Sequence, residues 1–288
     1  MKVSLVVPTY GREQVLCETL AALLEQRYPD YELIVIDQTA LHEPLTEQFL
    51  ADNRRRMRHH RETSPSLPHA RNLGLSLATG DVVLFVDDDV LPDDEHLIAH
   101  HARCYNDPKV GAVAGRVIEP LPPNAPPGVA RVNVFGRIVS NFTGGQPTEV
   151  EMAKGANMSF RRSAILAAGG FDTRYIGNAL LEETDACYGL RAGGWKILYE
   201  PRAGLRHRMA QSGGCRETSW NEGRYWLFHN SALFYRKRKH RLGIPLFLAF
   251  FSLRGILLVR RNKGGLRDYL NLMYGIVRGL RACGKPQL

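Results

Sequence analysis

The sequence predicts an α/β protein with a mostly parallel, Rossmann-like sheet flanked by helices, followed by a helical and basic C-terminal extension. Strand-like and helix-like patterns alternate over the first 90 residues, while the last third contains long apolar and basic runs. Such alternation is typical of a doubly wound sheet, in which ligands gather at the carboxyl ends of the strands.

The predicted strands are continuous apolar runs, as expected for strands buried on both faces of a parallel sheet. They cover residues 3–7, 33–36, 82–86 and 110–117. Helices are expected over residues 15–24, where apolar residues fall at helical spacing, and over 70–78. The segment 119–128 carries five prolines, which predicts a mobile loop.

The composition narrows the class of protein. With 288 residues, 44% hydrophobic and 23% charged, the chain is globular rather than disordered. Five widely spaced cysteines without a CxxC pair argue against a disulfide scaffold or a zinc ribbon, and favour a reducing cytosol. The apolar stretch at the N-terminus is too short for a signal peptide. GxGxxG, GxxxxGK[ST], GxSxG and HExxH motifs are absent, which removes the main support for nicotinamide enzymes, P-loop NTPases, α/β-hydrolases and zincins.

Polar residues stand where the predicted strands end. The first strand runs into Pro8, Thr9 and Tyr10, the second into Asp37, and the third into three consecutive aspartates at 87–89. Carboxylates at a strand end suit a hard divalent cation that also binds a diphosphate. A solvated acidic turn with helix-capping aspartates is the less favoured alternative.

Several motifs together resemble family 2 glycosyltransferases. They are Val-Pro-Thr-Tyr (7–10), Ile-Val-Ile-Asp (34–37), Ala-Arg-Asn-Leu-Gly-Leu (70–75), Phe-Val-Asp-Asp-Asp (85–89), Lys-Gly-Ala-Asn-Met-Ser-Phe-Arg-Arg (154–162), Gly-Gly-Phe-Asp (169–172) and Leu-Glu-Glu-Thr-Asp (181–185). The resemblance runs from residue 3 to about residue 215 in the family's order. It implies a glycosyltransferase A-type fold, a nucleotide-sugar donor, a divalent metal and inversion at the anomeric carbon.

The resemblance also implies roles for residues of the donor site. Donor binding would fall to Pro8, Thr9, Tyr10, Arg12, Asp37, Arg71, Asp87 and Asp88, with Thr9, Tyr10 and Asp37 holding the base and ribose. The metal, Mn²⁺ or Mg²⁺, would be held by Asp89 and Asp87, with His207 reaching the metal or the diphosphate. A packed or surface histidine is the alternative for His207. The chain departs from the family's Asp-Asp-Gly-Ser pattern at Asp37-Gln38-Thr39.

The same resemblance implies which residues carry out the reaction and which lie near the acceptor. Glu182 and Glu183 match the family's Glu-Asp motif, so Glu183 is the expected catalytic base, and Asp185 is expected to orient the site. Acids that merely favour the first turn of a helix are the alternative. Gly155 and Asn157 resemble the loop under the donor sugar and acceptor, although a strand-to-helix turn would look the same.

Two further clusters are interpreted as solvent-facing. His96, His100 and His101 are expected on a solvated helix face rather than around a metal. The basic run 54–61 is expected to be a solvated loop rather than a nucleic-acid site.

The two parts of the chain differ in net charge. Residues 1–199 carry 20 Lys and Arg against 25 Asp and Glu, whereas residues 200–288 carry 18 against 4. The run 242–259 is almost entirely apolar, but basic flanks on both sides and Arg254 near its middle disfavour a membrane span. An interfacial helix on anionic lipid is favoured, and a buried or dimer-forming helix is the alternative.

The sequence therefore predicts a catalytic, nucleotide-sugar-binding domain over residues 1–215 and a helical, membrane-associating region over 216–288. The expected activity is inverting, metal-dependent transfer of a sugar to a hydroxyl in bacterial cell-surface polysaccharide or glycolipid synthesis. The expected partners are a UDP or dTDP sugar rather than a GDP sugar, a saccharide or lipid-linked acceptor, and the inner face of the cell membrane, with no nucleic acid. A nucleotidyltransferase and a non-enzymatic nucleic-acid- or membrane-binding protein are the alternatives.

Overall fold

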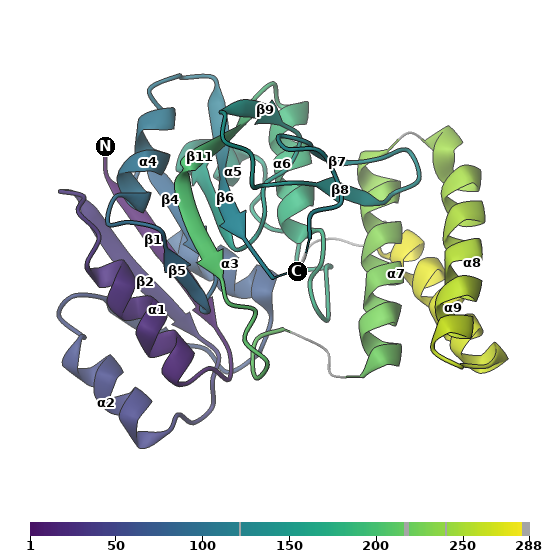
Figure 1. The fold of residues 1–288 in the computed structure, drawn as a ribbon, viewed down its shortest axis with the longest axis horizontal. Coiled ribbons are helices and arrows are strands. Elements are labelled where there is room, and N and C mark those ends of the chain that lie inside the picture. The colour runs from purple at the N-terminus through teal and green to yellow at the C-terminus, as the bar shows by residue number, and fades with distance from the viewer. Residues whose placement is uncertain (121, 216–218, 240, 284–288) are drawn as a thin grey trace.

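The computed structural model describes residues 1–120, 122–215, 219–239 and 241–283, and shows one large sheet with helices on both faces and three long helices at one side (Figure 1). Along the sheet the strand order is β3-β2-β1-β4-β10-β6-β11-β5, and β9 pairs with β11.

The first half of the sheet is parallel. It contains β1 (Val3–Thr9), β2 (Tyr31–Asp37), β3 (Arg58–Arg61) and β4 (Val82–Val86). The helices α1 (Gln14–Leu24), α2 (Pro44–Asp52) and α3 (Leu67–Leu77) connect these strands. Every residue of β1 and β4 is buried, because helices cover both faces of the sheet, and this burial explains their unbroken apolar runs.

The second half of the sheet is mixed. Strand β10 (Asn157–Arg161) lies antiparallel between β4 and β6 (Val110–Ile118), and β11 (Lys196–His207) runs parallel to β6. Shorter antiparallel strands are β5 (Val90–Pro92) and β9 (Thr148–Val150) on β11, and β7 (Ala130–Val132) pairs with β8 (Ile138–Ser140) as a separate hairpin. The helices of this half are α4 (Leu97–Cys104), α5 (Arg162–Ala167) and α6 (Glu182–Ala192). The predicted α/β class and its mostly parallel sheet are confirmed.

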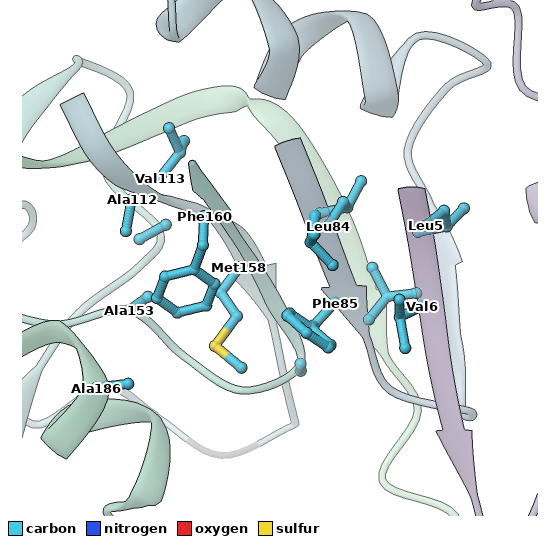
Figure 2. Packing of buried hydrophobic residues seen from close by; sticks show 14 of the residues in the cluster. Leu5, Val6, Leu84, Phe85, Ala112, Val113, Ala153, Met158, Phe160 and Ala186 are labelled. Carbon is cyan, nitrogen blue, oxygen red and sulfur yellow. The ribbon is translucent and has the colours of Figure 1, made fainter. Parts of the chain in front are cut away.

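The main core fills the space between the sheet and its helices. Leu5, Leu84, Met158 and Val113 from four neighbouring strands are fully buried, and Figure 2 shows such side chains side by side. Phe85 packs edge-to-face on Phe160, with ring centroids 6.1 Å apart. This contact secures the antiparallel strand β10 against the parallel half of the sheet.

The basic run and the histidine cluster, both expected to face solvent, contribute residues to the sheet and to the buried interior. Residues 58–61 form β3, an edge strand, so the basic run 54–61 is a loop only in its first half. His101 is fully buried and hydrogen-bonds to Asn157 and Ser159 of β10, and burial lowers its pKa to about 4. The expectation of a solvated face was wrong for His101, because α4 lies directly on the sheet.

The C-terminal helices are α7 (Trp220–Arg238), α8 (Ile244–Arg261) and α9 (Leu266–Ala282), with a 3-10 turn, η1 (Arg241–Gly243), before α8. They confirm the predicted helical extension, of which residues 216–218, 240 and 284–288 lie outside the described parts of the chain. Gly275 and Gly279 of α9 face the backbone of α7 so closely that a side chain at either position would collide with it. Within the described residues, each helix is too short or too polar to cross a membrane.

Helix α7 joins the extension to the sheet domain. Leu233 and Phe234 belong to the main core, whereas Phe228 packs in a second apolar cluster with α8 and α9. Ionic contacts add to this packing: Lys237 pairs with both Asp172 and Asp185, and Arg238 Nε lies 2.6 Å from Asp185 Oδ1. Asp185, predicted to orient the site, thus holds α7 in place.

The Asp172 contacts predict a pH-dependent loss of stability. Burial opposes ionisation of Asp172, but hydrogen bonds from Arg174 and Lys237 outweigh it and hold its pKa well below the usual range. We expect Asp172→Asn to lower the free energy of unfolding by about 2 kcal/mol at neutral pH. A carboxyl group with a depressed folded-state pKa contributes stability above its unfolded pKa of about 3.9, and that contribution is lost as the pH falls further. Urea unfolding at neutral and acidic pH measures both effects.

Asp107→Asn is the matched control for this substitution, because Asp107 forms an exposed pair with Lys196 at 3.9 Å. Its effect should stay within about 0.5 kcal/mol. Equal effects of the two variants at neutral pH would contradict the role given to Asp172.

Candidate functional site

Three aspartates follow β4 at the carboxyl end of the parallel strands, and two of them are buried. Asp88 and Asp89 are 5% and 1% exposed. The Thr9 hydroxyl donates to Asp88 Oδ2 at 2.7 Å, and the Arg12 guanidinium lies 3.3 Å from an oxygen of each of these two carboxylates. Burial nevertheless raises the pKa of Asp88 to about 7, against the opposing effects of Arg12 and Thr9.

Asp87, Asp89 and His207 could hold a metal ion. One ligand atom from each lies within 4.8 Å of the others, and His207 Nε2 is 3.0 Å from Asp89 Oδ1. Two carboxylates and an imidazole form a hard oxygen and nitrogen donor set that fits Mn²⁺ and, with water ligands, Mg²⁺. The three residues predicted for this role come from the ends of β4 and β11 and meet at one edge of the sheet.

Glu119 contacts the His207 ring nitrogen that faces away from the aspartates. Its Oε1 lies 2.8 Å from His207 Nδ1, and its Oε2 pairs with Lys154. Burial opposes a charge on His207, but hydrogen bonds with Asp89 and Glu119 outweigh it and raise the His207 pKa to about 9. A carboxylate on the far nitrogen of a ligating histidine sets the tautomer and the ring orientation. Glu119 was not predicted as a site residue, although an acid directly after the apolar strand 110–118 is the same signal that identified Asp87.

A pocket of about 180 Å³ opens beside these carboxylates. It is lined by Pro8, Thr9, Tyr10, Arg12, Gln38, Leu67, Asp87, Asp88, Asp89, Asn178, His207, Gly214 and Cys215. The predicted donor residues at 8–10, 12 and 87–88 are therefore brought together around one cavity. Tyr10 lines the cavity and is 39% exposed, so this aromatic side chain is accessible to a ligand.

At the end of β2, Gln38 lines the pocket, whereas Asp37 does not. Asp37 is fully buried and Oδ2 lies 2.8 Å from both His42 Nε2 and His59 Nε2, while Oδ1 accepts from the Thr39 backbone N–H. Burial opposes ionisation, but these bonds hold the Asp37 pKa well below its usual value. Its predicted contact with the base stays a prediction, and Gln38 is the residue of this strand end that lines the cavity.

Arg71, predicted to bind the donor, lies behind Asp87 and is not among the residues that line the cavity. It is almost fully buried, pairs with Glu182, and lies 3.5 Å from Asp87 Oδ1. Its guanidinium also donates to the Gly155 carbonyl at 3.2 Å, and a side chain at Gly155 would crowd it. Arg71 thus links the metal-site aspartate, the predicted sugar loop and the start of α6.

The predicted catalytic acids at the start of α6 have different surroundings. Glu182 is buried at 1% exposure as the counter-ion of Arg71, whereas Glu183 is half-buried. Burial and Asp87 raise the pKa of Glu183, although Arg71 acts in the opposite direction. Asn157 is fully buried, with its amide bonded to the Arg116 and Ala203 carbonyls, so it supports the sheet rather than lining the cavity.

The loop that follows β11, residues 208–215, borders the pocket. The Asp89 carboxylate accepts from the Ala210 N–H at 2.8 Å, and Arg12 donates to the carbonyls of Ala210 and Ser212. The Gly214 N–H donates to the Tyr10 carbonyl at 2.6 Å, and Gly213 and Gly214 both adopt positive φ angles. Gly213 also lies so close to the Gly11 backbone that a side chain there would collide with it.

Known proteins share both the sequence and the fold. The profile of the family described as "Glycosyl transferase family 2" matches residues 4–165. The chain is similar to the glucosyl-dolichyl phosphate glucuronosyltransferase of Haloferax volcanii, with 29% identity over 226 residues that cover 73% of this chain and 70% of that protein. It is also similar to the pre-mycofactocin glycosyltransferase of Mycobacterium tuberculosis, with 34% identity over 48% of this chain and 29% of that protein.

Two solved structures have a similar fold at low identity. Staphylococcus aureus TarS 1–349 in complex with UDP-GlcNAc matches with a TM-score of 0.68 and 16% identity over 98% of this chain and 82% of that one. The mannosyltransferase PcManGT from Pyrobaculum calidifontis, in complex with GDP-Man and Mn²⁺, matches with a TM-score of 0.58 and 17% identity over 99% and 76%. The match to the family profile covers more than half of the chain, and the fold agrees with it. The chain therefore belongs to glycosyl transferase family 2, has the glycosyltransferase A-type fold, and is a glycosyltransferase.

Proposed function

We propose that this enzyme transfers a sugar from a nucleoside-diphosphate donor to an acceptor hydroxyl, with a divalent metal and with inversion at the anomeric carbon. The observation that carries the proposal is the group formed by Asp87, Asp89 and His207 beside the cavity at the carboxyl ends of β1 and β4. Similar folds bind GDP-Man with Mn²⁺ and UDP-GlcNAc, which supports the same donor class here.

The donor would lie in the cavity with its diphosphate toward the aspartates. Asp87, Asp89 and His207 would hold Mn²⁺ or Mg²⁺, which as a Lewis acid neutralises the charge of the departing nucleoside diphosphate when bound. The Tyr10 ring would stack against the base. The Gln38 amide nitrogen donates to the Ser64 and Ser66 carbonyls at 2.7 and 3.3 Å, which leaves the amide oxygen to accept an N–H from the base. Uracil and thymine offer such a donor at N3, and guanine offers one at N1, so this contact fits all three bases. A UDP or dTDP sugar is the proposed substrate, in keeping with the UDP-GlcNAc bound by the similar TarS structure.

Glu183 would act as the catalytic base. Its raised pKa brings the carboxylate closer to the basicity that proton abstraction near neutral pH requires. Glu183 would take the proton from the acceptor hydroxyl as that oxygen forms a bond to the anomeric carbon. The bond from this carbon to the diphosphate oxygen breaks with its electron pair, and attack from the opposite face gives inversion.

The acceptor is proposed to be a saccharide or a lipid-linked sugar, consistent with the similarity to the glucosyl-dolichyl phosphate glucuronosyltransferase of Haloferax volcanii. A nucleotidyltransferase fits less well, because the turn after β1 holds one glycine in Pro8-Thr9-Tyr10-Gly11-Arg12 instead of a glycine-rich phosphate loop.

The role of Glu183 predicts a loss of turnover without a loss of donor binding. Glu183→Gln should slow nucleoside diphosphate release at least about 100-fold, because it removes the base but keeps the shape of the side chain. Donor affinity, measured by calorimetry with whichever of the UDP, dTDP and GDP sugars the wild type binds, should stay unchanged. Glu149→Gln, on the exposed position of β9, is the control. Wild-type turnover in Glu183→Gln would disprove this assignment.

The role of Glu119 predicts weaker metal binding. Glu119→Gln removes a negative charge from the partner of His207 Nδ1, so Mn²⁺ affinity in the presence of a nucleoside diphosphate should fall about 10- to 100-fold. Electron paramagnetic resonance of free Mn²⁺ measures this affinity directly. Glu95→Gln, which alters a more exposed glutamate paired with Arg27, should leave it unchanged. Equal affinities for the two variants would show that Glu119 does not support the metal site.

A further inference from the structure

Helix α8 carries apolar side chains on two sides. Phe247 and Phe251 are fully buried and pack on Tyr235 and Phe228 of α7, with ring centroids 4.5 and 5.1 Å apart. On the opposite side, Leu246, Leu253 and Leu257 follow one another at intervals of seven and four residues and so share one face of the helix. Leu253 and Leu257 are each 58% exposed. The packing within the described chain therefore uses only one of the two apolar sides.

The exposed side continues onto neighbouring segments. Leu242, just before α8, is 84% exposed. At the tip of the β7–β8 hairpin, Phe135 packs on Phe250 of α8 with ring centroids 5.3 Å apart, and the adjacent Val134 is 64% exposed. We name this surface the outer apolar face, which comprises Val134, Phe135, Leu242, Leu246, Phe250, Leu253, Ile256 and Leu257. Figure 1 shows α8 on the side of α7 that faces away from the sheet.

Positive charge surrounds the outer apolar face. Arg260, Arg261 and Lys263 are exposed at the end of α8, and Arg137 is exposed on the hairpin. Residues 242–283 contain seven Lys and Arg but a single acid, Asp268. The Asp268 carboxylate accepts from the Gly265 N–H at 2.8 Å and is used to begin α9.

We infer that the outer apolar face docks on an anionic lipid surface. Leucine and phenylalanine side chains would enter the boundary between headgroups and acyl chains, while the arginines and the lysine reach the phosphates. A contiguous exposed apolar surface of this kind marks an interaction site rather than ordinary surface variation. A second copy of the chain fits less well, because a symmetric contact would bring two strongly basic surfaces together. The inference does not depend on the reaction that the enzyme catalyses.

Vesicle flotation tests the inference with the full-length protein. Wild type should float with vesicles of phosphatidylcholine and phosphatidylglycerol at low salt, and much less with phosphatidylcholine alone. The double variant Leu253→Ser and Leu257→Ser should reduce partitioning at least about tenfold, because it removes apolar area from the contact. Replacing both Arg260 and Arg261 by Gln should also reduce it about tenfold or more at low salt, with a smaller effect at high salt.

Matched controls separate this surface from general stickiness. Leu41 and Leu45 are 81% and 84% exposed near α2, so the double variant Leu41→Ser and Leu45→Ser should float like wild type. The exposed Arg54 and Arg55, changed to Gln, provide the charge control. Circular dichroism melts confirm that each variant is folded. Absence of wild-type flotation, or flotation unchanged by the α8 variants, would overturn the inference. A dimer in sedimentation that Leu253→Ser and Leu257→Ser dissolve, without vesicle binding, would assign the face to a second copy.

Discussion

The central physical constraint is the burial of carboxylates at the end of β4. Removing Asp88 and Asp89 from water is costly unless opposite charge and hydrogen-bond donors replace the lost solvation. The chain supplies them from distant segments: Arg12 and Thr9 after β1, His207 at the end of β11, and the Ala210 N–H in the loop beyond it. The shape of the cavity is a consequence of these contacts, because they bring the ends of β1, β4 and β11 together.

The sheet makes this arrangement possible. Parallel strands β1 and β4 end at the same edge, and the antiparallel β10 between β4 and β6 brings β6 and β11 alongside them. Glu119 at the end of β6 can then support His207 at the end of β11. Buried carboxylates also hold the C-terminal helices. Asp172 and Asp185 form ion pairs with Lys237 and Arg238 of α7, and Asp185 lies in the first turn of α6, so these pairs connect α7 to the sheet domain.

Local patterns predicted what depends on local burial. Apolar runs located β1, β2, β4 and β6, and the aspartates that follow β4 located the cavity. Contacts between distant segments were harder to predict. His101 looked like one of several polar residues on a helix, yet α4 lies on β10 and the ring is enclosed by Asn157 and Ser159. Asp37 stands at the end of its strand much as Asp87 does, but it is enclosed by His42, which precedes α2, and by His59 of β3. The residues at the end of one strand cannot reveal partners that come from these other segments. The long apolar run 242–259 could not show which of its sides is buried until α7 and α9 were placed against it.

The most direct test of the account is the position of the metal. Crystals grown with Mn²⁺ and UDP should give an anomalous peak at the manganese edge between the Asp87 and Asp89 carboxylates and His207 Nε2, with the diphosphate on the same ion. A peak at another set of residues, or bound nucleotide whose diphosphate lies away from these aspartates, would contradict the proposed donor site.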